Sequence, residues 1–510
     1  MKKTLQKLAI AFTALVIIAI AQSAPAHAAS FTVAAGSDET MTNGSCSLSE
    51  AIININNQTV ANSDCPAGDG VDDTITISAG TVTLVANLPT ITESIYIKGA
   101  GMSQTIIDGG SVYQVFSSQS STPTQFKISD MKVTAFDSVA VGLVRGDLIV
   151  NKIEIDGANM VSNSILAAGL LVGSISSGED VRIAVNDSYV HGISVSTGSV
   201  GNVGIGMLGS GGIAVDADIN RVTVTDISNS GGNSYGIIFT SGIFGDLTPN
   251  TFLGSINNAT VSNINSTTGV VGGIGMSNAS SGTESKATLG VNNSTITGTK
   301  GAEPLPGLHG GGLFVFGATD GASSVSKNTI DVQNVLLANN ITEPTVSSNC
   351  IGDIDFSPIL GVDGAGTTIS KIASSGGNLS DDTTCSSYFN KTVDQNNIFN
   401  LGTTLSPLAN NGGHIPTMAL MSGSSAIDSG VTIAGLLQDA RGSVRPQGLA
   451  YDSGAYESPY TSATTAPAVL KATSTSLAST GQSKTTLIAF AFAVLTTSLG
   501  TVIMVARQKV

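Results

Sequence analysis

A short pattern that returns about every 35 residues constrains the fold of this chain more than any other feature. Each copy has an aliphatic residue, then Asn, two further residues and alternating aliphatics. The Asn positions are Asn151, Asn186, Asn220, Asn257 and Asn292, at intervals of 35, 34, 37 and 35 residues, and Gln333 marks a weaker sixth copy. A second element, Gly followed by aliphatics, comes 16 to 20 residues after each Asn, at Gly169, Gly204, Gly236, Gly273 and Gly312. Two strand-like segments per period predict a solenoid.

The physical chemistry of stacking favours a parallel β-helix. One rung cannot bury its apolar face alone, whereas stacked rungs place Val, Ile and Leu in continuous internal columns. Aligned Asn side chains at a turn can hydrogen-bond along the stack, so we predict an Asn ladder. Small β-sandwiches would recur at roughly 100 residues, and propeller blades carry aromatic signatures that this chain lacks. The predicted fold class is therefore all-β, with parallel β-helix repeats over residues 111–399.

Composition agrees with a β protein and argues against nucleic-acid binding. The chain has 60 Gly, no Trp and only 11% charged residues, which suits short strands joined by tight turns. Its formal net charge is −15. Six of the 21 basic residues lie in the terminal segments, and without those segments 15 basic residues remain against 36 acidic ones, a net charge of −21. Such a surface repels nucleic acid and anionic lipid.

The first 28 residues have the features of an export signal. Lys2, Lys3 and Lys7 form a basic start, and an apolar run follows over residues 8–21. Ala26-His27-Ala28 then supplies the small-x-small pattern that signal peptidase accepts. We predict a signal peptide over residues 1–28. The alternative is an N-terminal membrane anchor that stays in place.

The C-terminal end combines a linker, a short motif and an apolar segment. Residues 458–476 are rich in Ser, Thr, Ala and Pro and predict a linker. Residues 487–506 are mostly apolar and long enough to span a membrane, and Arg507 and Lys509 follow them. The motif between these two segments is Leu477-Ala478-Ser479-Thr480-Gly481.

The order of motif, apolar span and basic tail over residues 477–510 resembles the cell-wall sorting signal of Gram-positive surface proteins. That family's motif is Leu-Pro-x-Thr-Gly, so Ala478 stands where the family has Pro. The resemblance implies a sortase-type transpeptidase and cell wall peptide as partners, with Thr480 as acyl donor and Gly481 as the leaving residue. The alternative is a transmembrane helix that is retained as a single-pass anchor. Either reading places the body at the extracellular face of the cell envelope.

Four cysteines in an exported chain predict two disulfides, although three pairings are open. Cys46 and Cys65 lie close together near the mature N-terminus. Cys350 and Cys385 are 35 residues apart, one period of the repeat. Neighbouring strands lie roughly 4.8 Å apart, within the Cα range of a disulfide, so we predict a Cys350–Cys385 bond. The Cys and His spacing suggests no metal site and no cofactor.

Two modules flank the repeats. The first contains Cys46-Ser47-Leu48-Ser49-Glu50-Ala51-Ile52 and ends at Thr105-Ile106-Ile107-Asp108-Gly109. It resembles the CSLREA domain of secreted bacterial right-handed β-helix proteins over residues 29–110, with Ser49 in place of that family's Arg. This resemblance implies a right-handed β-helix whose first rung is capped by a short helix.

The second module covers residues 400–457. Its motifs are Leu405-Ser406-Pro407-Leu408, Asn411-Gly412-Gly413, Ala426-Ile427-Asp428-Ser429-Gly430, Asp439-Ala440-Arg441-Gly442 and Asp452-Ser453-Gly454-Ala455-Tyr456-Glu457. The set resembles the choice-of-anchor Q domain, which precedes variable anchors on surface β-helix proteins. Asp439, Arg441, Arg445, Asp452 and Glu457 predict a structural network of ion pairs and turns within it.

Catalysis is the alternative to a binding role. Glycoside hydrolysis needs two carboxylates at a set separation, and lyases need a base with cationic support. The acidic pairs Asp72-Asp73 and Asp381-Asp382 have no basic partner at one-period spacing, and His191, His309 and His414 fall at phases that we take to be unrelated to the repeat.

We therefore predict a non-catalytic, envelope-anchored β-helix that acts as an adhesin or surface-layer component. Its Ser-, Thr- and Asn-rich face matches carbohydrate hydroxyls as a ligand. A surface-displayed polysaccharide lyase or glycoside hydrolase is the alternative.

Overall fold

The computed structural model describes residues 28–462. The exceptions are 71, 120–123, 161, 163–165, 174–179, 196–200, 210–211, 242–247, 249, 303–310, 343–345, 356 and 358–361. The predicted signal peptide, except its last residue, and the predicted sorting segment lie outside the described residues. Within them, no helix combines the length and the apolar character that crossing a membrane requires.

The described body consists of two sheets of mostly parallel strands, so the all-β, parallel-strand prediction is confirmed. The larger sheet begins with β1 (Ser30–Val33), β2 (Gly36–Asp38), β3 (Asp73–Ile77), β4 (Gly80–Leu84), β5 (Ile95–Lys98), β6 (Thr105–Asp108) and β8 (Gln125–Thr134). It continues with β10 (Gly146–Asp156), β12 (Val181–His191), β13 (Ser194–Val195), β15 (Ala214–Asn229), β17 (Thr251–Asn257), β18 (Thr260–Ser266), β20 (Glu284–Asn292), β21 (Thr295–Thr297) and β22 (Lys300–Gly301). It ends with β24 (Val325–Gln333), β25 (Leu336–Ala338), β26 (Ile341–Thr342), β27 (Val346–Ser347), β29 (Thr367–Gly376) and β30 (Leu379–Ser380).

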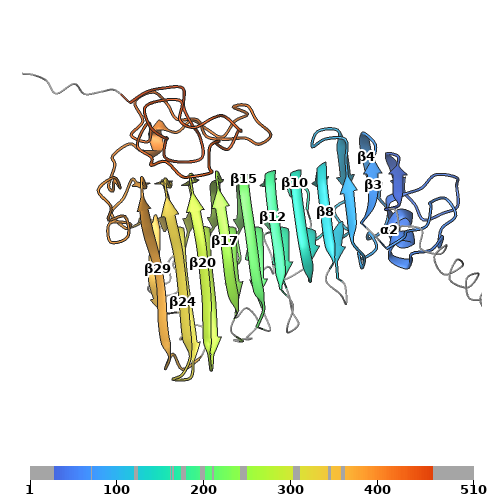
Figure 1. Ribbon diagram of the computed structural model, residues 1–510, viewed down its shortest axis with the longest axis horizontal. Coiled ribbons are helices and arrows are strands. Elements are labelled where there is room, and N and C mark those ends of the chain that lie inside the picture. The colour runs from blue at the N-terminus through green and yellow to red at the C-terminus, as the bar shows by residue number, and fades with distance from the viewer. Residues whose placement is uncertain are drawn as a thin grey trace, which may run out of the picture. The chain divides into compact units, whose positions relative to one another are not determined.

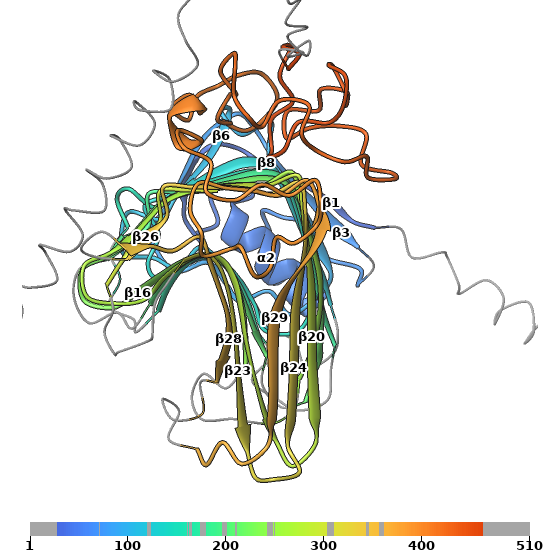
Figure 2. The ribbon, with the colours of Figure 1, turned by 90° about the vertical axis from the view of Figure 1, so that its left-hand side faces the viewer.

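The smaller sheet contains one strand from each successive turn of the chain. Its strands are β7 (Phe116–Ser118), β9 (Val139–Leu143), β11 (Leu166–Gly173), β14 (Gly201–Gly209), β16 (Asn233–Ser241), β19 (Val271–Ser281), β23 (Gly311–Asp320) and β28 (Cys350–Asp355). Figures 1 and 2 show the two sheets as walls of a coil in which each turn lies on the one before it. Core side chains of both walls face the inside of the coil and form one continuous apolar cluster.

The Asn positions of the repeat lie on neighbouring strands in register. Asn151 pairs with Asn186, which pairs with Asn220, and the series continues through Asn257, Asn292 and Gln333. Asn292 Nδ2 donates to Asn257 Oδ1 over 2.9 Å. The residue after each Asn has a positive φ and forms a corner of the coil, at Lys152, Asp187, Arg221, Asn258, Asn293 and, after Gln333, Asn334. The repeat therefore marks where each rung turns.

The Gly of the second repeat element marks a place where two walls meet. An ideal Cβ on Gly236 would lie 2.5 Å from Gly273 O on the next rung and 2.5 Å from Val261 Cγ1. Gly204 and Gly273 are restricted in the same way, by Val224 and Ile296 respectively. No side chain larger than hydrogen fits here unless the walls separate, which explains why Gly returns with the period.

We expect Gly236→Ala to lower the free energy of unfolding by about 1–3 kcal/mol, because overpacking forces the backbone to shift. Urea unfolding followed by circular dichroism measures the change. Gly290→Ala is the matched control, since its Cβ would meet no atom closer than 3.7 Å. Equal stability of the two variants would contradict the close approach.

A helix closes the N-terminal end of the coil. Helix α2 (Leu48–Asn57) begins after the N-cap Ser47, whose side chain accepts from Glu50 N, while the Glu50 carboxylate accepts from Ser47 N. This capping box satisfies backbone donors that the first turn leaves unpaired. Its apolar side chains belong to the continuous core, and Figure 1 shows α2 at the N-terminal end of the stack, beside β3. The Cys46–Cys65 disulfide joins the start of this segment to the loop after the helix, with 4.9 Å between Cα atoms.

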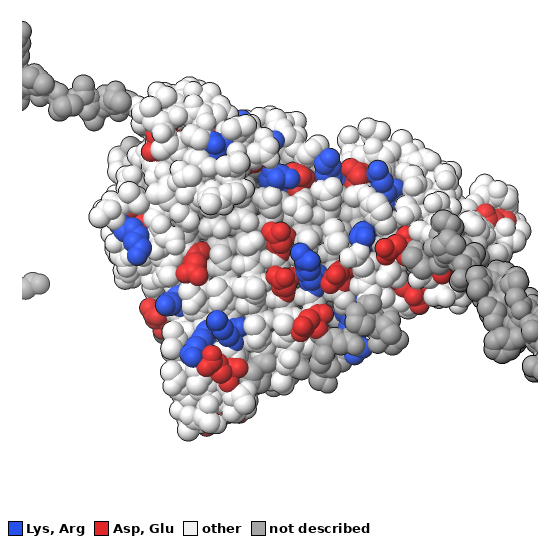
Figure 3. Space-filling view, in the orientation of Figure 1, with Lys and Arg blue, Asp and Glu red and all other residues white. Residues whose placement is uncertain are grey.

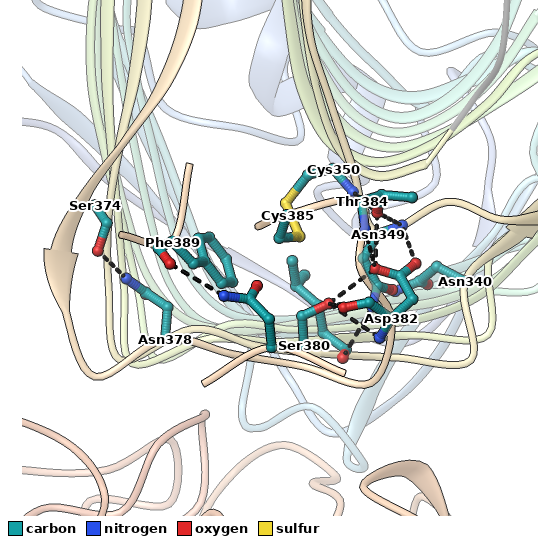
Figure 4. The surroundings of a disulfide bond; sticks show 12 residues. Asn340, Asn349, Cys350, Ser374, Asn378, Ser380, Asp382, Thr384, Cys385 and Phe389 are labelled. Carbon is teal, nitrogen blue, oxygen red and sulfur yellow. Dashed lines mark hydrogen bonds between the residues drawn. A yellow bond between two sulfur atoms is a disulfide. The ribbon is translucent and has the colours of Figure 1, made fainter. Parts of the chain in front are cut away.

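The other end of the coil is closed by a disulfide and a network of buried amides (Figure 4). Cys350 and Cys385 are bonded, with 5.0 Å between their Cα atoms and a separation of 35 residues. Asn349 is fully buried, and its side chain donates to Leu337 O, Ser380 Oγ and Asp381 Oδ1. These bonds give hydrogen-bond partners to buried groups of β25, β30 and the residue after β30.

The C-terminal module, residues 400–457, has almost no regular secondary structure beyond the 3-10 turn η2 (Gly402–Thr404) and isolated bridges. Buried ion pairs hold it together instead. Arg445 Nη1 lies 2.8 Å from Glu457 Oε2, and both side chains are fully buried. Arg441 pairs with the buried Asp439 at 2.7 Å and lies over the ring of Tyr456. The charged residues of this module thus form a structural network.

Candidate functional site

Between two corners, each rung contributes a four-residue segment whose alternate side chains point away from the core. These segments, at 131–134, 153–156, 188–191, 222–225, 259–262, 294–297 and 335–338, stack into a narrow third wall, which we call the short face. Its outward pairs are Lys132 and Thr134, Glu154 and Asp156, Tyr189 and His191, Thr223 and Thr225, Thr260 and Ser262, Thr295 and Thr297, and Leu336 and Ala338. The short face is therefore charged at one end, hydroxyl-rich in the middle and apolar at the other end.

The C-terminal module covers the apolar end and the hydroxyl-rich middle of the short face. Leu336, Ala338 and Leu379 pack with its Leu401, Leu405, Leu420 and Ile427. Ala455 N donates to Thr295 Oγ1 over 3.0 Å, and Thr223 Oγ1 donates to Pro416 O over 2.7 Å. Tyr189 packs against Ile415, Ala440 and Ala455. Tyr189 is thus the boundary between the covered part of the short face and the charged end.

Beyond Tyr189, four charged or polar side chains form a compact group, which we call the polar cluster: Lys132, Glu154, Asp156 and His191. Lys132 Nζ lies 2.9 Å from Glu154 Oε1 and 2.7 Å from Asp156 Oδ2. His191 Nε2 lies 3.3 Å from Glu154 Oε1, and its Nδ1 lies 3.8 Å from Asp156 Oδ1. The ring of Tyr189 stacks on that of His191 with 4.1 Å between centroids. Side-chain exposures of 17 to 23% leave the cluster half-buried but accessible.

The cluster shifts the pKa values of its members. The hydrogen bond with His191, together with Lys132, lowers the pKa of Glu154. Burial opposes ionisation of Asp156, but the Lys132 hydrogen bond and the Ala158 N–H outweigh it and lower the pKa of that carboxyl. The same two carboxylates outweigh burial at Lys132 and raise the pKa of its ammonium. Burial and the neighbouring acids Asp226, Glu154 and Asp156 raise the pKa of Tyr189 to about 12. The two carboxylates and the lysine are therefore all held in their charged forms.

The sequence-based expectation that His191 falls at a phase unrelated to the repeat is wrong. Asp156 and His191 face each other across β10 and β12, as do Glu154 and Tyr189. Both pairs are separated by 35 residues, one period of the repeat, so the spacing carried the signal. Glu154 and Asp156 are not adjacent in the sequence, so a pattern of adjacent acidic pairs does not reveal them. Lys132 could not be found by spacing, because the rung that separates it from Glu154 is only 22 residues long.

Glu154, Asp156 and His191 also form a group of possible metal ligands, with one atom of each within 4.8 Å of the others. The ammonium of Lys132 already bridges the two carboxylates at hydrogen-bonding distance. A divalent cation would have to displace this ammonium from the carboxylates, or bind beside it against the repulsion between the two positive charges. The donor set therefore fits an internal ion-pair network better than a metal site.

We expect Lys132→Met to raise the pKa values of Glu154 and Asp156. A carboxyl whose pKa is lowered by folding stabilises the fold above its unfolded pKa, and this stability is lost as pH falls through the folded value. The ordinary values here are 4.5 and 3.8, so the loss begins below about pH 4.5. Wild type should lose more stability than Lys132→Met over this acidic range. Carboxyl NMR titration measures the shift in pKa. Lys327→Met, which removes the exposed Lys327–Glu284 pair, is the control. Unchanged pKa values of Glu154 and Asp156 in Lys132→Met would contradict the ion-pair geometry.

The remaining predicted site residues fall in three places. The four cysteines form the two disulfides at opposite ends of the coil, and the Asn positions lie along one corner. The sorting motif, Leu477 to Gly481, lies outside the described residues. On the face shown in Figure 3, acidic and basic side chains are sparse and interspersed, with no continuous basic patch.

Neither a scan of family models nor a search of curated proteins finds a match to this chain. Among solved structures, the A-module of mannuronan C-5 epimerase AlgE6 from Azotobacter vinelandii is similar at 12% identity. The match covers 64% of this chain and 94% of that one, with a TM-score of 0.21. A likeness at that score bears on neither the fold nor the function of this chain.

Proposed function

We propose that this chain is an exported right-handed parallel β-helix, displayed at the outer face of a cell envelope, that binds a neutral glycan without cleaving it. In this proposal the chain combines a CSLREA-type N-terminal module with a choice-of-anchor Q-type C-terminal module. The tail attaches the body through sortase cleavage at Thr480 or through a retained helix. The polar cluster beside Tyr189 is the observation that carries the binding role.

Two disulfides support an extracellular location, because such bonds persist mainly in oxidising compartments. The mature C-terminal residue tests the mode of attachment. Mass spectrometry of the wall fraction should find Thr480 joined to wall peptide if a sortase acts. An intact Val510 in the membrane fraction would support the retained helix instead, and recovery of the body in the cytoplasm would refute display altogether.

The polar cluster has the chemistry of a sugar-binding site. Carboxylates and a lysine accept and donate hydrogen bonds to hydroxyl groups, and the Tyr189–His191 pair adds an aromatic surface. The contacts of Glu154 with Lys132 and with His191 are both made by the same oxygen, Oε1. The net charge of −15 disfavours polyanionic ligands, which makes a neutral glycan the best match.

The same contacts favour binding over hydrolysis. A glycosidase needs a general acid whose pKa is raised, so that it still holds a proton near neutral pH. Here the pKa values of both carboxyls are lowered, and Lys132 neutralises part of their charge. The raised pKa of Tyr189, about 12, also disfavours it as a base.

A glycan array probed with the secreted body tests the proposal. We expect binding to neutral glycans that falls at least about tenfold in Glu154→Gln, because a charged hydrogen bond contributes about 1.5–3 kcal/mol. Glu284→Gln is the control, since Glu284 is an exposed residue of an ion pair away from the short face. An array without any neutral-glycan binder, or equal binding by both variants, would refute the site.

A polysaccharide-active enzyme is the second candidate, favoured by the stacked Tyr189 and His191 beside two carboxylates. Assays for reducing ends and for unsaturated uronate, across plant and bacterial polysaccharides, distinguish the two candidates. Product release that disappears in Glu154→Gln would replace the binding proposal with catalysis.

A further inference from the structure

Asp73 is a fully buried carboxyl at the first residue of β3. Its Oδ1 accepts a hydrogen bond from Ala29 N over 2.8 Å, and its Oδ2 accepts one from Asp69 N over 3.3 Å. Burial raises the pKa of this carboxyl, and the neighbouring Asp69 raises it further. Among the described residues, no ion pair includes Asp73. Asp73 is thus a buried acid beside a second acid, and its hydrogen-bond donors are amides alone. A positive charge placed beside it would stabilise its ionised form.

Ala29, whose backbone nitrogen donates to Asp73, is held in place by other contacts. The carbonyl oxygen of Ala29 accepts from Thr74 N over 2.9 Å, and Ser30 pairs with Thr74 in the parallel ladder between β1 and β3. The Ala29 side chain packs, half-buried, against the core. The nitrogen of Ala29 is therefore held beside the carboxylate by backbone bonds that do not involve Asp73.

Ala29 is also the residue that follows the predicted cleavage pattern Ala26-His27-Ala28. We propose that removal of the export signal converts the Ala29 amide nitrogen into an α-ammonium that forms a buried ion pair with Asp73 and locks the first rung. The inference rests on the proposed export of the chain. A signal peptidase adds one water across the Ala28–Ala29 bond, so Ala28 leaves with a new carboxylate and Ala29 keeps a new ammonium.

Cleavage changes the energetics of this site without moving the nitrogen. Before cleavage, an uncharged N–H faces the buried carboxylate. After cleavage, a full positive charge lies at the same position, in surroundings where charge interactions are stronger than in water. The pair should raise the pKa of the α-ammonium and lower that of Asp73. Asp69, on the preceding loop, is the other charged group that acts on Asp73. Its negative charge also stabilises the α-ammonium of Ala29.

The test compares four exported full-length chains: wild type, a Gly-Ser insertion between Ala28 and Ala29, Asp73→Asn, and the insertion combined with Asp73→Asn. The insertion keeps the cleavage pattern but leaves an amide at Ala29. In wild type, we expect the α-amine pKa to exceed its ordinary value of about 7.7–8.0 by at least one unit, equivalent to about tenfold. It should be ordinary in the other three chains. Asp72→Asn, an exposed neighbour of equal charge, is the control and should behave as wild type.

Hydrogen exchange of the β1 and β3 amides gives the second readout. At pH 7 the insertion should reduce their protection by about tenfold or more in the Asp73 background and have no effect in the Asp73→Asn background. Because the ammonium has a raised pKa when folded, this protection is complete below the unfolded value of about 7.7 and is lost as pH rises through the folded value.

The N-terminal mass separates the two possible failures. A secreted chain that starts at Ala29 but shows an ordinary α-amine pKa, or the same insertion effect in both backgrounds, overturns the ion pair and leaves export intact. A chain that retains residues 1–28, or starts elsewhere, overturns both the cleavage and the ion pair.

Discussion

Replacing Arg445 with methionine is expected to destabilise the C-terminal module by about 3–5 kcal/mol, the usual cost of leaving a buried charge without its partner. Both Arg445 and Glu457 have fully buried side chains, 2.8 Å apart. Arg445 also donates to Asp452 O over 3.0 Å and to Gly454 O over 2.8 Å. Its replacement removes the donor to two carbonyls and leaves the buried Glu457 carboxylate with only the backbone donors Gln447 N and Asp452 N and no positive charge, in a module that has almost no backbone ladder of its own.

Limited proteolysis of the module and urea unfolding measure this effect. Arg182→Met, at an exposed position on β12, is the matched control and should change stability by less than about 0.5 kcal/mol. Adding Glu457→Met to Arg445→Met should recover part of the loss, because no isolated charge then remains. A loss below about 1 kcal/mol for Arg445→Met would contradict a structural role for the pair.

Removal of the Cys350–Cys385 bond, by Cys350→Ser with Cys385→Ser, is expected to lower the free energy of unfolding by about 3–4 kcal/mol. The bond closes a loop of 35 residues, for which chain entropy gives about this value. It also holds the segment around Cys385 to β28, where Cys350 N donates to Thr384 Oγ1 over 3.1 Å. The amide network of Asn349 and Ser380 should therefore open with it, since both residues lie beside the bond (Figure 4).

Urea unfolding of the double variant, together with hydrogen exchange at residues 349–385, measures the change. The comparison is the double Ser variant of Cys46 and Cys65, whose shorter 19-residue separation predicts a smaller entropic effect. Unchanged exchange at Asn349 would show that the bond does not support the end of the coil.

Strand positions and rung spacing could be predicted from the sequence because each depends on local pattern. The Asn and Gly positions of the repeat lie in register on neighbouring strands, since corners and close wall contacts restrict side-chain size in every turn. The Ser47 and Glu50 pair also identifies a helix start, because a capping box involves only residues three positions apart.

The site was harder to predict, because its members come from different rungs. The 35-residue separation of Glu154 from Tyr189, and of Asp156 from His191, could have been found by applying the period to charged residues. The 22-residue step to Lys132 could not, because the length of a short rung depends on where its loops close.

The periodic pattern was sufficient for the stack of rungs, because strand register propagates from one turn to the next through identical contacts. The position of the C-terminal module was decided only in three dimensions. The module packs on the apolar end of the short face, which includes Leu336 and Leu379. It is also held by a hydrogen bond between Thr223 and Pro416, which are 193 residues apart. No local pattern encodes such a contact, since it arises only when two surfaces that are distant in the sequence match in shape and polarity. That placement covers the hydroxyl-rich middle of the short face and leaves the polar cluster beside Tyr189 accessible.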